Sequence, residues 1–160
     1  MLRHFNFWLT GAGWAEAFFT SDEQTIRFDI SYLSDPLADL IVALLSLHRD
    51  LQRQVIVDFY NEPGLHRLSM TMMDNHQVQM QIRNLERIEG NADVANDWKS
   101  TIPTFEVTDA LDNIMTVIHT GMLDLRKRHS DEDYLKQWIN HPFPSAVFKT
   151  LEKIVVMPKS

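Results

Sequence analysis

Apolar and polar side chains alternate along much of the first half of the chain, which is the pattern of strands with one buried face. The clearest run covers 25–32, where Ile26, Phe28, Ile30 and Tyr32 are separated by polar residues. Shorter runs predict further strands at 5–9, 14–20, 55–60, 67–72 and 77–82, and a short strand just before residue 108. Turn-forming residues between several of these runs favour antiparallel pairing of neighbouring strands.

The spacing of apolar residues changes to three and four over 37–47, which predicts an amphipathic helix within the strand-rich half. Ser34 or Asp35 can cap this helix. Pro36 fits its first position, where a missing N–H costs nothing.

Helical spacing returns in the last third of the chain and predicts a long helix over 111–125. Ser130 with Asp133 resembles a capping box that begins a second helix, and a last helix is expected from about Ser145. Residues 89–104 have little periodicity, so we interpret them as an irregular link.

These elements predict one α+β domain over residues 1–160. We expect an antiparallel sheet of about five strands, with helices packed mainly on one face. The N-terminal half would be rich in strands and the C-terminal part helical.

Composition and charge limit the classes of function. Of 160 residues, 44% are hydrophobic and 23% charged, as in globular domains, and the absence of cysteine excludes disulfides and thiolate metal sites. The chain has no long apolar run and no leader-like start, so we expect a cytoplasmic protein without a membrane span. The net charge of −7 disfavours nucleic acids and anionic membranes as partners and permits a basic protein partner.

Motifs that would indicate catalysis are missing from the sequence. A strand rather than a helix is expected after Gly11-Ala12-Gly13, so this segment is interpreted as a bulge and not as a phosphate-binding loop. No two of the seven histidines have metal-binding spacing, and no serine stands in a nucleophile elbow. Carboxylate pairs lie at predicted helix starts, where they cap N–H groups: Asp35/Asp39, Asp109/Asp112 and Asp131/Asp133. We therefore expect no catalytic residue, no metal, no cofactor and no enzymatic activity.

The acidic residues are concentrated between 86 and 112, a segment with seven acidic and only two basic residues. An irregular, carboxylate-rich segment with an aromatic residue can dock a basic protein surface. The partner-binding residues expected from this pattern are Glu86, Glu89, Asp93, Asp97 and Trp98. The other interpretation is a solvated loop whose tryptophan packs under the sheet.

Several short motifs recur in a distinctive order along most of the chain. They are Gly13-Trp14-Ala15-Glu16, the segment Ser31–Leu40, Glu62-Pro63-Gly64, Tyr134, Trp138, His141-Pro142-Phe143-Pro144 and Leu151. This order resembles a largely uncharacterised family of small bacterial cytosolic proteins. Some relatives of that family look like immunity proteins of polymorphic toxin and contact-dependent growth inhibition systems. The resemblance implies a protein-binding role and carries over no functional residue.

Together these observations favour a non-enzymatic binding protein that neutralises a cognate bacterial toxin, itself expected to be basic, in a one-to-one complex. The alternative is a small-molecule-binding or regulatory domain. Its pocket would lie between sheet and helices and be lined by Trp14, Tyr32 and His119.

Overall fold

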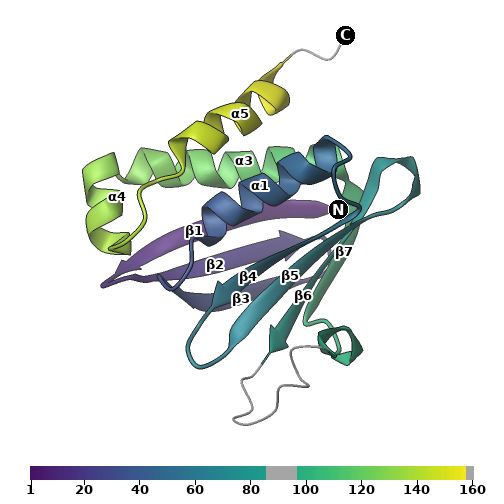
Figure 1. Cartoon of the computed structure of the whole chain (residues 1–160), viewed down its shortest axis with the longest axis horizontal. Coiled ribbons are helices and arrows are strands. Elements are labelled where there is room, and N and C mark those ends of the chain that lie inside the picture. Colours follow the sequence, from purple (N-terminus) through teal and green to yellow (C-terminus); the bar gives the residue numbers. More distant parts are fainter. Residues whose placement is uncertain (86–96, 158–160) are drawn as a thin grey trace.

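The computed structural model describes residues 1–85 and 97–157, and seven strands and four α-helices lie in these ranges (Figure 1). The strands are β1 (Leu2–Gly11), β2 (Trp14–Ser21), β3 (Thr25–Ser31), β4 (Gln54–Tyr60), β5 (Leu65–Met72), β6 (Gln77–Leu85) and β7 (Phe105–Ala110). The helices are α1 (Pro36–His48), α3 (Leu111–Arg128), α4 (Asp131–Trp138) and α5 (Ser145–Val156), with 3-10 turns at η1 (Asp74–His76) and η2 (Trp98–Ser100). The protein is α+β, as the sequence predicts.

The strands form two antiparallel sheets, so the prediction of a single sheet of about five strands is wrong. Sheet A has the order β1-β2-β3, and sheet B has the order β4-β5-β6-β7. The chain leaves sheet A after β3, forms α1 and begins sheet B with β4. The N-terminal half is therefore not purely strands, and hydrogen-bonded pairing stops where the helix intervenes.

Phenylalanine side chains fill the space where the two sheets meet. The ring of Phe19 on β2 lies 5.0 Å from that of Phe5 on β1 and 6.3 Å from those of Phe28, Phe59 and Phe105. Phe59 and Phe105 belong to sheet B, so both sheets share one core. Figure 1 shows the helices gathered along one side of the strands, where their apolar stripes close this core.

Local signals at two helix starts act as the sequence predicts. The Asp35 side chain caps α1 by accepting a bond from the Ala38 N–H (3.4 Å), and Pro36 occupies the first helical position. Ser130 caps α4 by accepting a bond from the Asp133 N–H (3.1 Å).

Helix α3 runs along β1 and closes the open edge of that strand. The Asn113 side chain near its start donates to the Leu2 carbonyl (3.1 Å), and Arg128 at its end donates to the Phe7 carbonyl (2.8 Å). Between them, Gly121 lies so close to β1 that an added Cβ would be 2.1 Å from the Phe5 carbonyl oxygen. Covering an edge strand in this way removes a template for unwanted pairing.

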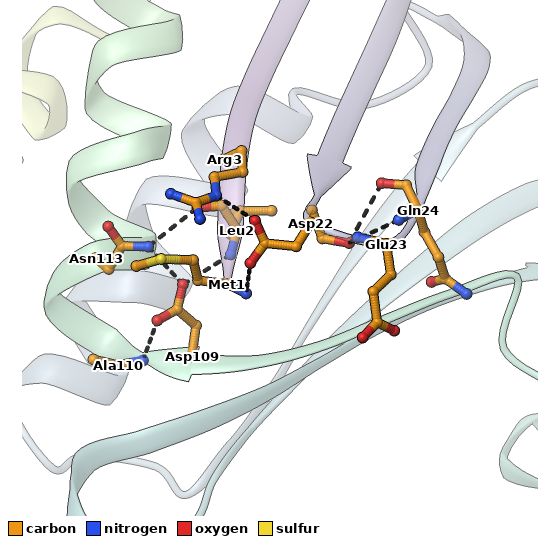
Figure 2. Close-up of polar contacts among 10 residues, drawn as sticks. Met1, Leu2, Arg3, Asp22, Glu23, Gln24, Asp109, Ala110 and Asn113 are labelled. Atoms are coloured by element: carbon orange, nitrogen blue, oxygen red, sulfur yellow. Dashed lines mark hydrogen bonds and ion pairs between the residues drawn. The ribbon is translucent and has the colours of Figure 1, made fainter.

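Asp109 joins the beginning of β1 to the junction of β7 and α3 (Figure 2). Its buried carboxylate accepts bonds from the Leu2 N–H (2.8 Å), the Ala110 N–H (2.7 Å) and the Asn113 side chain (2.5 Å). Three donors compensate the burial of one charge. Asp109 therefore does more than cap a helix, since it fixes β1 against α3.

Candidate functional site

Three segments that lie far apart in the sequence meet at one end of the molecule. They are the β1–β2 turn, the β3–α1 connection, and α4 with the residues that follow it. The Gly13 N–H donates to the Gln137 carbonyl (2.9 Å), and His141 Nε2 donates to the Tyr32 carbonyl (3.1 Å). Gly13 has a φ of +78°, and an added Cβ there would lie 2.3 Å from the Tyr32 ring. Most of the motifs that carry the family resemblance belong to these segments.

A tight turn at Ile139 directs the chain from α4 to His141. Ile139 has φ 76° and ψ −64°, and the Asn140 N–H donates to the Trp138 carbonyl (3.1 Å). These are the features of a γ-turn with positive φ, a strained conformation that is rare for a β-branched residue. Such strain costs on the order of 1–3 kcal/mol and is found mainly where function requires a particular geometry.

Two aspartates at the start of α1, the N-cap Asp35 and Asp39 in the first turn, lie in the electrostatic field of His141. Burial raises the pKa of Asp35, while the Ala38 N–H and His141 lower it less strongly. Burial also raises the pKa of Asp39, and the charge of Asp58 adds to that effect. We call Asp35, Asp39 and His141 the acidic corner.

Asp58 differs from the two aspartates of the acidic corner because it has a strong cationic partner. Arg67 binds both of its carboxylate oxygens, at 2.8 and 2.9 Å. The group that lowers the pKa of both Asp35 and Asp39 is instead a histidine, His141.

The wall behind the acidic corner is built by one face of α4. Tyr134 packs against Phe143 and Trp138 against Phe7, with ring centroids 5.6 Å apart in each pair. The Tyr134 hydroxyl and the Trp138 indole N–H are buried and have no hydrogen-bond partner among the described residues. Burial, and secondarily the charge of Asp35, raises the pKa of Tyr134.

Apolar side chains are exposed in the segments that form this end of the molecule. Leu33, between Tyr32 and the α1 cap, is 55% exposed, and Ile139 is 45% exposed. Carboxylates beside exposed apolar groups and a rigid aromatic wall form a surface suited to protein contact.

The partner-binding residues expected from the sequence lie only partly in the described ranges. Glu86, Glu89 and Asp93 lie outside the described residues, and Asp97 is exposed. Trp98 is 8% exposed and packs on the outer face of sheet B. The guanidinium carbons of Arg67 and Arg83 are each 5.3 Å from its ring centroid, and Lys99 Nζ is 5.5 Å away.

Of the three residues expected to line a ligand pocket, Trp14 and Tyr32 lie near each other, and His119 lies elsewhere. His119 lies between α3 and α5, where Nε2 donates to Glu152 (3.0 Å) and the ring stacks on Phe148. Trp14 and Tyr32 lie at the end of the molecule that holds the acidic corner, since Trp14 pairs with Ser31, the residue before Tyr32. A described pocket does lie between sheet B and the helices, but none of these three residues lines it.

The sequence pattern predicts helix capping for Asp35 and Asp39 and gives no sign of their proximity to His141. The missing information was the direction of the chain at Ile139, for which the sequence holds no local signal, since isoleucine disfavours positive φ.

No family model, curated protein or solved structure matches the chain. Within residues 1–85 and 97–157, no three potential metal-ligating side chains come together, and no helix is long and apolar enough to cross a membrane.

Proposed function

We propose that this protein is a non-enzymatic binding protein that neutralises a cognate bacterial toxin by forming a one-to-one complex in the cytoplasm. The acidic corner is its contact with a basic surface of that toxin. The observation that carries the proposal is the place of Asp35 and Asp39 at the start of α1, next to the exposed Leu33 and within reach of the charge of His141.

A raised carboxylate pKa means that the charged form is less favourable in the free protein than in water. A lysine or arginine of a partner, placed within about 4–6 Å, would favour the charged form again. Part of the cost of desolvating these groups is then borne during folding and not during binding. The exposed Leu33 and Ile139 offer apolar area beside the charges. The resemblance to immunity proteins adds support of a different kind. Toxins that are nucleases are commonly basic, because their substrates are polyanions, and an acidic inhibitor is attracted to them.

The partner can be identified by capture from a lysate of the host and mass spectrometry of the eluate. The proposal requires that the captured protein arrests growth when it is expressed alone and that co-expression of this chain restores growth. A captured protein that is harmless alone would contradict the toxin-neutralising role.

The contact surface is tested by neutralising the acidic corner with the double variant Asp35→Asn, Asp39→Asn. Asparagine caps a helix as well as aspartate does, so α1 should remain intact. We expect the association rate at low ionic strength to fall by about threefold to tenfold, with a weaker salt dependence.

The matched control is Glu23→Gln with Asp124→Asn, which removes two exposed carboxylates elsewhere and gives the same change in net charge. If the acidic-corner variant and the control associate at the same rate, the acidic corner is not the contact.

The second candidate function is a small-molecule-binding or regulatory domain. One observation favours it, a pocket of about 310 Å³ between the end of α1, the β5–β6 turn and the start of α3. A ligand that binds only the folded state must raise the melting temperature, which a thermal-shift screen measures.

A further inference from the structure

The pocket beyond the end of α1 combines an apolar floor with a polar rim. Its floor is formed by Leu47, Met72 and Leu111, which are 1%, 9% and 5% exposed. Its volume of about 310 Å³ is at the small end of the range for ligand sites. None of Asp35, Asp39 and His141 lines this pocket, which lies at the other end of α1 (Figure 1), so the pocket and the acidic corner are separate. Ligand binding at this pocket extends the second candidate function, the small-molecule-binding domain, and is independent of the acidic corner.

The rim of the pocket is held by backbone in the left-handed region. Asp50 (φ 55°) follows α1, while Asn75 (φ 59°) and His76 (φ 58°) form the β5–β6 turn. The Met73 N–H donates to the Gln77 carbonyl (2.7 Å) and closes that turn. Polar groups fixed in this way lose little freedom on binding a ligand.

Asp50 occupies the position after a helix that glycine or asparagine normally takes. The Asp50 N–H donates to the Leu47 carbonyl (3.2 Å), and the Leu51 N–H donates to the Ser46 carbonyl (2.9 Å). This pair of bonds is a Schellman motif, whose left-handed residue is most often glycine.

Aspartate is a poor choice at this position for stability, for two reasons. Its Cβ is strained in the left-handed region, and its charge lies at the negative end of the α1 dipole. Glycine or asparagine would therefore end α1 at lower cost, and Asp50 adds a carboxylate to the rim of the pocket.

The chemistry of the rim selects the class of ligand. The ionisable side chains that line the pocket are Asp50, Asp112, His48 and His76, and the Asp50 carboxylate disfavours an anion. In the described ranges, no three potential metal ligands come together, which disfavours a metal ion here. The positive end of α3 also reaches the pocket, and Asp112 in its first turn offsets it.

We propose that this pocket binds a small organic cation, namely a primary ammonium attached to a compact apolar body. The ammonium donates to the Asp50 carboxylate, and the apolar body lies on Leu47, Met72 and Leu111. The C-terminal end of α1 adds attraction for the positive charge. Asn75 and His76 border the site from the opposite turn.

Benzylammonium is a suitable probe, because benzyl alcohol and benzoate are its neutral and anionic counterparts of similar shape. The ¹⁵N-labelled full chain is titrated with each compound at millimolar concentrations and low ionic strength. We expect saturable shifts of the Asn75, His76 and Leu111 amide signals with benzylammonium, and much weaker effects with the other two.

The variant Asp50→Asn separates binding from folding, because asparagine adopts the left-handed region at least as well as aspartate does. We expect its affinity for benzylammonium to fall by about threefold or more, with an unfolding midpoint no lower than that of the parent chain. The control variant Asp124→Asn should bind the probe as the parent chain does.

Three results would overturn the proposal. These are no saturable shift at the pocket with benzylammonium, equal affinity for benzoate or benzyl alcohol, or unchanged affinity in Asp50→Asn.

Discussion

Replacing Gly121 by alanine tests whether the close approach of α3 to β1 holds the two elements together. The added Cβ would lie 2.1 Å from the Phe5 carbonyl oxygen, 2.8 Å from Cδ1 of the Phe5 ring and 2.9 Å from the Phe5 carbonyl carbon. Ordinary contacts of this kind begin near 3.4 Å. Two of these three atoms are backbone, so no rotation of a flexible side chain removes the clash. Helix and strand must separate by about 1 Å.

The expected loss of stability follows from three contributions. Overpacking of this kind costs roughly 1–3 kcal/mol, occasionally more. Separation also weakens the bonds from Asn113 to Leu2 and from Arg128 to Phe7, each worth about 1 kcal/mol. Alanine restores about 1 kcal/mol of helix propensity. The net expectation is a destabilisation of about 3 kcal/mol, or roughly 6–12 °C in melting temperature for a domain of this size.

Urea unfolding followed by circular dichroism measures this change as a lower midpoint with an unchanged slope. The control is Thr120→Ala, an exposed neighbour on α3, which should change stability by no more than about 0.5 kcal/mol. Trimming the ring with Phe5→Leu should not rescue Gly121→Ala, because the shortest contact is to backbone. A Gly121→Ala protein as stable as the parent chain would refute the reasoning.

Three further predictions concern buried polar groups. Burial lowers the pKa of His66 to about 4 from an ordinary 6.5, so the unfolded chain takes up its proton first as pH falls. Stability should therefore decline by about 3 kcal/mol between pH 6.5 and 4, and unfolding of a His66→Phe variant across that range should lack this share of the decline. Asp109→Asn places an amide opposite the Leu2 N–H and should lower the free energy of unfolding in urea by about 2 kcal/mol. An unchanged free energy of unfolding would show that the carboxylate does not hold β1. Tyr134→Phe removes a buried hydroxyl that has no partner among the described residues, so stability should stay equal or rise by up to about 1 kcal/mol. A clearly lower melting temperature would contradict this and would mean that the hydroxyl is hydrogen-bonded.

The strands and helices of this fold were predictable because the spacing of apolar residues within each segment indicates its type of secondary structure. The alternation over 25–32 corresponds to β3 (Thr25–Ser31), and the helical spacing over 111–125 lies within α3 (Leu111–Arg128). Pairing was less predictable. Alternation tells which side of a strand is buried but not which strand lies beside it, because pairing depends on contacts distant in sequence. The division into two sheets therefore could not be seen in the pattern.

The acidic corner was predictable only in parts. The sequence assigns Asp35 a capping role that the structure confirms, and it ends α4 before His141-Pro142. What brings His141 back to Asp35 is a positive φ at Ile139, against the preference of that residue. At Ile139, therefore, the local preference of the residue disagrees with the fold. Asp50 is a milder case, because glycine is the usual residue there but aspartate adopts the left-handed region more readily than most.

The edge of β1 that α3 covers also bears on the order of events during synthesis. The Leu2 N–H donates to Asp109, 107 positions later in the chain, and the Leu2 carbonyl accepts from Asn113, 111 positions later. The Phe7 carbonyl accepts from Arg128, 121 positions later. On a ribosome, β1 leaves the exit tunnel long before the helix that covers it. Its hairpin with β2 can form early, but the opposite edge stays open until almost the whole of α3 has been made. During that interval the nascent chain exposes a ten-residue strand edge, and the risk of aggregation is concentrated there.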